Sequence, residues 1–192
     1  MPTEAGATLI AIARAAIAAG LGQPQVVAKG AAWLQEPGAT FVTLTQRGQL
    51  RGCIGTLQAH RSVLEDVQAN AVAAATRDPR FPPLAAEELG HTRIEVSLLS
   101  QMQPLDFGSE SDATAQLRPG IDGVLLEFGH HRSTFLPQVW EQLPDRREFM
   151  AQLKQKAGLP ANFWADGVRL QRYTVAKWKE PELPLATRTE TP

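Results

Sequence analysis

One short run of the chain, from Leu50 to Thr56, contains residue types that can do chemistry. It holds the only cysteine of the sequence, Cys53, and an arginine, Arg51, two positions before it. A thiol acts as a nucleophile or a metal ligand only as the thiolate, and a nearby guanidinium favours that form. In a β-strand alternate side chains share a face, so Arg51 and Cys53 would be neighbours about 7 Å apart. The spacing therefore predicts a thiol supported by a positive charge.

Two glycines, Gly52 and Gly55, flank this cysteine and allow two interpretations. Glycine weakens a strand and often marks a place where a ligand or another backbone approaches closely, which would make both glycines part of a binding site. The structural alternative is that Cys53 is a small buried hydrophobe and that the glycines only relieve packing against a helix.

A hairpin is expected to position this run. Residues 41–45 have the alternation of a strand, and residues 46–49 form a loop of hairpin length in which Gly48 can adopt a positive φ angle. We therefore expect 41–45 and 50–56 to pair in antiparallel fashion.

A further strand is predicted at 93–99, where Glu95 and Ser97 share the face opposite to the apolar residues. If this strand lies beside the cysteine strand, Glu95 would pair with Arg51 across the sheet and hold the guanidinium near Cys53. The pattern assigns catalytic roles to Cys53, Arg51 and Glu95, and a ligand or partner contact to Ser97. The alternative is an ordinary exposed ion pair, which contributes about 0 to 1 kcal/mol.

A segment with three prolines, residues 78–83, is a second candidate part of the site. Prolines stiffen a loop, and a stiff loop holds its side chains at little further cost in entropy. Arg80 is therefore a candidate to bind a ligand or partner, whereas Phe81 is expected to fill the core. The segment follows a helix that starts with a capping box, Ser62 to Glu65, and ends near Arg77.

The rest of the chain alternates between helix and strand signals. Helices are expected at 4–19, 84–89, from 137 and at 146–157; strands at 121–128 and 168–175; a polar loop with one helical turn at 103–119; and no assignment is made for 23–38. The proline- and threonine-rich tail, 180–192, has too little apolar content to fold by itself and is expected to be loose.

Two adjacent histidines, His130 and His131, raise the question of a metal site because imidazole is a common metal ligand. Neighbouring residues of a strand or hairpin point to opposite faces, so the two rings are not expected to bind one ion. We predict no metal site and no cofactor, and leave the role of both histidines open.

The composition excludes several classes of function. The 192 residues are 43% apolar, enough for one sizeable core, and the net charge is −1, with 19 basic and 20 acidic residues spread along the sequence. Without a basic stripe, binding to nucleic acid is not expected. Because there is neither a signal-peptide pattern nor a membrane-spanning run, and a lone cysteine forms no internal disulfide, we expect a cytoplasmic protein that does not enter membranes.

The blocks around Cys53 carry a resemblance that covers nearly the whole chain, from about Ala7 to Lys179. In order, they are Leu50–Gly55, Asp78–Pro83, Glu95–Ser97, Phe135–Val139, Lys156–Leu159 and Trp164. The sequence resembles the AMMECR-one domain family, whose bacterial members are called AmmeMemoRadiSam system protein A. The resemblance implies an α+β domain of two subdomains with the glycine–cysteine motif facing the cleft between them, no established activity, and association with Memo-like and radical-SAM proteins.

The predicted fold class is α+β, with antiparallel hairpins flanked by helices, because short turns rather than β–α–β crossovers join the strands. We expect one domain, 1–179, with a larger and a smaller lobe, a cleft between them, and the tail at 180–192. The leading functional hypothesis is a small enzyme or enzyme subunit whose cleft contains Arg51 and Cys53. The alternative is a noncatalytic adaptor that holds a peptide or protein partner in the same cleft.

Overall fold

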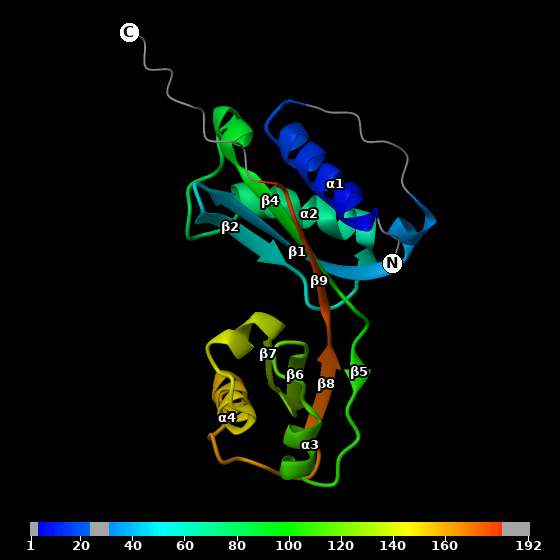
Figure 1. Cartoon of the computed structure of the whole chain (residues 1–192), viewed down its shortest axis with the longest axis vertical. Helices are drawn as coiled ribbons and strands as arrows, with labels where there is room; N and C mark the ends of the chain where they lie inside the picture. Colours follow the sequence, from blue (N-terminus) through cyan, green and yellow to red (C-terminus); the bar gives the residue numbers. More distant parts are fainter. Residues whose placement is uncertain (1–3, 24–30, 182–192) are drawn as a thin grey trace. The chain divides into compact units, whose positions relative to one another are not determined.

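The computed structural model describes residues 4–23 and 31–181. These residues form two compact units (Figure 1). Unit 1 contains the described residues up to Leu98 together with those from Lys177 onward, and unit 2 is the continuous segment Leu99–Ala176. No helix in the described ranges is long and apolar enough to cross a membrane.

Unit 1 is built on a five-stranded sheet with the order β2-β1-β4-β9, with β3 paired to β1. Its strands are β1 (Pro37–Gln46), β2 (Gln49–Gly55), β3 (Arg61–Ser62), β4 (Arg93–Leu99) and β9 (Val175–Lys179), and its helices are α1 (Ala5–Gly20), α2 (Val63–Thr76) and the short 3-10 helices η1 (Ala32–Gln35) and η2 (Ala86–His91). The helices α1 and α2 pack against each other, and α2 also contacts β1 and β2. Strand β2, which carries Cys53, is therefore an edge strand with a helix on one face.

Local sequence signals explain the elements around β2. Strands β1 and β2 form an antiparallel hairpin, and its turn residues Arg47 and Gly48 have φ angles of 50° and 77°. Helix α2 starts with the expected capping box, in which the Ser62 hydroxyl accepts from the Glu65 amide and the Glu65 carboxylate accepts from the Ser62 amide. The hairpin and the start of this helix are both confirmed.

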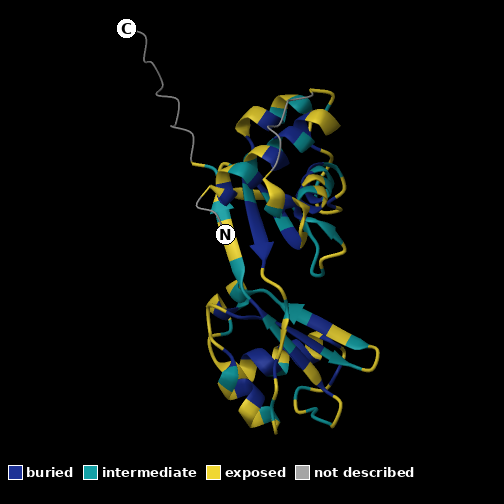
Figure 2. Cartoon of the chain, turned by 90° about the vertical axis from the view of Figure 1, so that its right-hand side faces the viewer, coloured by how far each residue is buried: buried dark blue, intermediate teal, exposed yellow. Residues whose placement is uncertain are grey.

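Unit 2 has a four-stranded antiparallel sheet with the order β5-β8-β6-β7. Its elements are β5 (Gln103–Pro104), α3 (Glu110–Gln116), β6 (Gly123–Phe128), β7 (His131–Phe135), η3 (Pro137–Glu141), α4 (Arg146–Lys156) and β8 (Arg169–Tyr173). Trp140 and Phe149 stack in its core with ring centroids 3.7 Å apart. The predicted α+β fold of antiparallel hairpins and flanking helices is confirmed, and buried residues run through the sheets while exposed residues cover the outer sides of the helices (Figure 2).

Some expected elements differ from the structure. The strand predicted at 168–175 is β8, which ends at Tyr173 in the sheet of unit 2, and a second strand that was not predicted, β9, follows from Val175 and joins the sheet of unit 1. The break falls at Thr174, whose carbonyl and amide are both bound by Ser100. The helix expected at 84–89 is the 3-10 helix η2 at Ala86–His91, and the single turn expected within 103–119 is the seven-residue helix α3. Most of the predicted tail lies outside the described residues.

Candidate functional site

Arg51 lies at an irregularity of the β1–β2 ladder. The register shifts between Leu44 and Thr45, which leaves Arg51 out of the residue pairs that run from Gly52 to Gly55 and from Gln49 to Leu50. A bulge of this kind re-aims a side chain and breaks strict alternation. The strand is therefore irregular at Arg51, and the expectation that Arg51 and Cys53 share a face stays a prediction.

The Arg51 guanidinium is enclosed by groups that were not predicted. Nε and Nη2 donate to the two carboxylate oxygens of Glu88 at 3.1 and 3.0 Å, and Nη1 donates to the Pro82 carbonyl at 2.8 Å. The side chain is only 13% exposed. These hydrogen bonds from Arg51, together with one from the Ala85 amide, lower the pKa of Glu88 to about 2. Arg51 thus fastens strand β2 to the loop before η2 and to η2 itself.

Glu95 is not the partner of Arg51, contrary to the prediction. Strand β1 lies between β2 and β4, so a residue of β4 is not a cross-strand neighbour of Arg51. The carboxylate of Glu95 instead lies 3.4 Å from the Lys177 ammonium on β9. Ser97, on the same strand as Glu95, is buried and is likewise separated from Cys53 by the width of β1. The predicted site residues of β4 are not brought to the cysteine.

The two motif glycines make room for packing. A Cβ atom at Gly52 would collide with the backbone carbonyl oxygen of Ala74 on α2, and one at Gly55 would collide with the ring of Phe41. The Ala74 carbonyl cannot move aside easily at Gly52, because Ala74 belongs to the last turn of the packed helix α2. The close approach of α2 to β2 therefore requires glycine at position 52.

Cys53 lies half-buried on β2, opposite Thr43 of β1. Its Sγ atom and the Thr43 Oγ1 atom are 3.2 Å apart, a hydrogen bond that either group can donate. The Cys53 amide donates to Asp78 Oδ2 at 2.8 Å. The edge of the sheet at the cysteine is thus closed by a carboxylate instead of a further strand.

Arg80 is the arginine that contacts Cys53. Its Nε and Nη2 donate to the two Asp78 oxygens at 2.9 and 2.7 Å, and Nη2 also reaches the Cys53 carbonyl at 3.3 Å. The Asp78 side chain is only 2% exposed whereas that of Arg80 is 54% exposed. The Arg80 hydrogen bonds hold the pKa of Asp78 well below its usual range despite burial, and Asp78 in turn raises the pKa of Arg80.

This geometry assembles Cys53, Thr43, Asp78 and Arg80, which we call the thiol site. Of the predicted site residues, it contains Cys53 and Arg80. Asp78 and Thr43 were not predicted as site residues. A carboxylate two residues before an arginine in a stiff loop is nevertheless a local signal for the Asp78–Arg80 pair. Thr43 could have been found from the hairpin register.

The adjacent histidines also differ from expectation. His130 is a turn residue of the β6–β7 hairpin, which follows Gly129 with its positive φ of 57°, so strand alternation does not apply to it. The two imidazole rings lie side by side with centroids 4.1 Å apart, and His131 Nδ1 is 2.8 Å from the Ala157 carbonyl oxygen. Within the described part of the chain, no group of three or more His, Cys, Asp or Glu side chains is placed to hold a metal ion.

Comparison with known proteins gives relatives along most of the chain. A protein of Methanothermobacter thermautotrophicus is 40% identical over 69% of this chain and 70% of its own length, and one of Methanocaldococcus jannaschii is 36% identical over 70% and 68%. The crystal structure of an uncharacterised protein from Pyrococcus horikoshii is similar in fold, with a TM-score of 0.80 and 31% identity over 94% of this chain and 93% of that one.

A family model also matches most of the chain. The AMMECR1 family model matches residues 10–178, which include every element from the middle of α1 to β9 and the whole thiol site. The resemblance seen in the motif blocks is therefore confirmed, and the chain belongs to the AMMECR1 family.

Proposed function

We propose that the chain is a small cytoplasmic enzyme, or the subunit of one, that uses the thiol site to bind and react with an anionic ligand. The observation that carries this proposal is the Asp78–Arg80 pair at Cys53. The buried Asp78 carboxylate binds both the Cys53 amide and the Arg80 guanidinium, so the cation is held beside the cysteine on a rigid frame. Preorganised groups of this kind lose little entropy when a ligand binds.

Arg80 has the right exposure to meet a ligand. Its Nη1 atom makes no hydrogen bond to any residue in the described ranges, while Nε and Nη2 are fixed by Asp78. A half-exposed guanidinium offers its planar donors to a carboxylate or phosphate group. The neighbouring thiol can then lose its proton to solvent and add to a carbonyl carbon of that same ligand, whose oxygen takes up the displaced electron pair and a proton.

The second candidate function is a noncatalytic adaptor that binds a partner through the same residues. One observation favours it: the Sγ atom of Cys53 is hydrogen-bonded to the Thr43 hydroxyl, which is not a general base, and no histidine contacts it in the described ranges. An activated cysteine is commonly paired with a base such as histidine. Memo-like and radical-SAM proteins, implied by the family resemblance, are the partners we would examine first.

The pH dependence of Cys53 alkylation tests the proposal, and the assay is unambiguous because the chain has one cysteine. We expect Arg80→Met to lower the rate at neutral pH by about threefold, since a positive charge that favours the thiolate is gone. Arg80→Lys should keep most of the rate because it keeps the charge. Arg77→Met, which removes a charge from an exposed neighbouring position, is the matched control.

The profiles also decide between the two candidates. If wild type, Arg80→Met and Arg77→Met give the same rates at every pH, Arg80 has no influence on the thiol and the adaptor is the better description. A wild-type rate no faster than that of a free cysteine peptide would lead to the same conclusion.

A further inference from the structure

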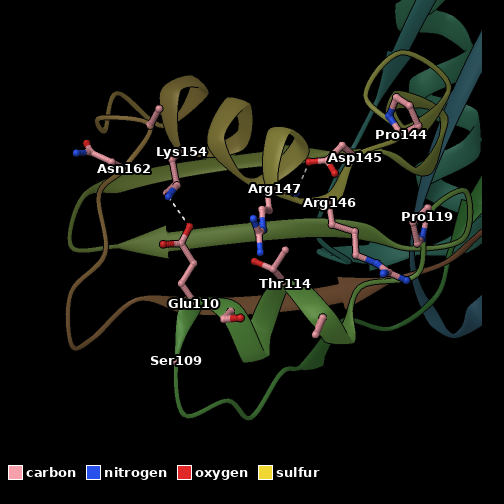
Figure 3. Close-up of a pocket in the computed structure, with 13 residues that line it drawn as sticks. Ser109, Glu110, Thr114, Pro119, Pro144, Asp145, Arg146, Arg147, Lys154 and Asn162 are labelled. Carbon is pink, nitrogen blue, oxygen red and sulfur yellow. Dashed lines mark hydrogen bonds and ion pairs between the residues drawn. The ribbon is translucent and has the colours of Figure 1, made fainter.

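Unit 2 contains an open cavity of about 970 Å³ that lies between α3 and α4 (Figure 3). Both helices contribute charged side chains to its lining. The α4 side contributes Arg146, Arg147 and Lys154, and the α3 side contributes Glu110 and Thr114. A cavity of this size is within the range that holds small molecules.

An ion pair forms part of the cavity wall. The Lys154 ammonium is 2.6 Å from a carboxylate oxygen of Glu110, and the Lys154 side chain is only 2% exposed. Because a buried lysine is costly unless it is paired, this contact fixes Lys154 and Glu110 to each other and links α4 to α3. The pair is neutral and gives the cavity a rigid wall.

Arg146 and Arg147, unlike Lys154, form no ion pair with a described residue. Asp145, the other carboxylate on the cavity, caps α4 by accepting from the amides of Arg147 and Glu148, both at 2.9 Å. Within the described residues, the only side-chain hydrogen bond of Arg146 is from Nε to the Leu117 carbonyl at 2.8 Å. Its two Nη atoms are therefore available to a ligand. Figure 3 shows the Arg147 side chain extending from α4 toward Thr114 on α3.

The positions of the two arginines indicate what they can bind. Consecutive residues of an α-helix are rotated by about 100°, so the guanidinium groups of Arg146 and Arg147 diverge and reach different parts of the cavity. Each can bind one carboxylate or phosphate group in a bidentate manner. We propose that this cavity binds a small molecule that carries two oxyanionic groups, one on each arginine.

The remaining lining suits such a ligand. The Thr114 hydroxyl makes no hydrogen bond to a described residue and lies next to Arg147 in Figure 3, so it is available as a donor to an oxyanion. Ala115, Pro119 and Ala161 contribute small apolar surfaces that leave room for the body of the molecule. The site lies entirely in unit 2 and does not depend on the function proposed for Cys53.

Calorimetric titration of the full chain with two probes tests the proposal. Inorganic pyrophosphate represents a phosphorylated ligand and succinate represents a dicarboxylate. We expect at least one probe to bind at submillimolar concentration, and the probe that binds identifies the source of the oxyanions. Arg147→Gln should weaken that binding by about tenfold, because it removes one bidentate contact without touching any contact that holds the fold.

Arg169→Gln provides the matched control, since Arg169 is an exposed arginine of unit 2 that does not line the cavity. It should leave the affinity unchanged within about twofold. Arg146→Gln should also weaken binding, and its unfolding midpoint reports separately on the lost contact with the Leu117 carbonyl. The proposal is overturned if neither probe binds at millimolar concentration, or if Arg147→Gln and Arg169→Gln change the affinity equally.

Discussion

Two arginine–carboxylate pairs lie along strand β2, and they are built in opposite ways. In the pair of Arg51 and Glu88 the guanidinium is enclosed and the carboxylate is the more exposed partner. In the pair of Arg80 and Asp78 the carboxylate is buried and the guanidinium is half-exposed. The arginine of the sequence motif is thus used to hold backbone carbonyls, whereas the arginine outside the motif is the one that a ligand can reach.

If the two pairs differ in this way, removing the Glu88 carboxylate should cause the largest loss of unfolding free energy. Glu88→Ala leaves the enclosed Arg51 guanidinium without a counter-charge. An unpaired charge that is largely shielded from water lowers the unfolding free energy by about 3 kcal/mol. Urea denaturation measures this loss. Glu87→Ala removes an exposed carboxylate one residue earlier and should stay within about 0.5 kcal/mol of wild type.

Removing the Asp78 carboxylate should lower the unfolding free energy by less than Glu88→Ala does. Asp78→Ala leaves the Cys53 amide without its acceptor but leaves the Arg80 guanidinium in contact with water, so we expect a loss of about 2 kcal/mol by the same denaturation measurement. A larger loss for Asp78→Ala than for Glu88→Ala would contradict the assignment of Arg51 as the enclosed, structural arginine.

The Arg51–Glu88 pair is also expected to make the stability of the fold depend on pH. The pKa of Glu88 is about 2 in the folded chain and 4.5 as its ordinary value, so the folded state binds fewer protons and gains stability from this group above pH 4.5. That stability is lost as the pH falls from 4.5 through about 2. The difference in unfolding free energy between wild type and Glu88→Gln should therefore shrink over this range. A difference that is constant with pH would show that the charge of Glu88 does not contribute.

The sequence predicted those features that depend on neighbours in the chain. The capping box at Ser62, the hairpin turn at Gly48 and the core face of β4 all follow from residues a few positions apart, and all three are confirmed. Alternation and capping rules describe these elements because the interactions that define them are local.

The partners of the site residues could not be predicted in the same way. Pairing Glu95 with Arg51 required β4 to lie next to β2, but β1 takes that position, and no local pattern reports the order of strands in a sheet. The contact of Arg51 with Glu88 joins residues that are 37 positions apart in the sequence, so no local pattern indicates it. Strand order and packing at an edge are tertiary properties.

The division of the last strand at Thr174 has a consequence for how the protein is made. During translation all of unit 2 is synthesised before β9 is complete, and β9 is the strand that completes the sheet of unit 1. Trp178 packs against Gly6, and the Glu180 carboxylate binds Arg14 and the Ile94 amide. These two residues follow unit 2 in the sequence, whereas α1, which they contact, precedes it. Unit 1 therefore reaches its complete structure only after all of unit 2 has been synthesised, and until then α1 lacks the contacts of Trp178 and Glu180 and one edge of β4 has no strand beside it.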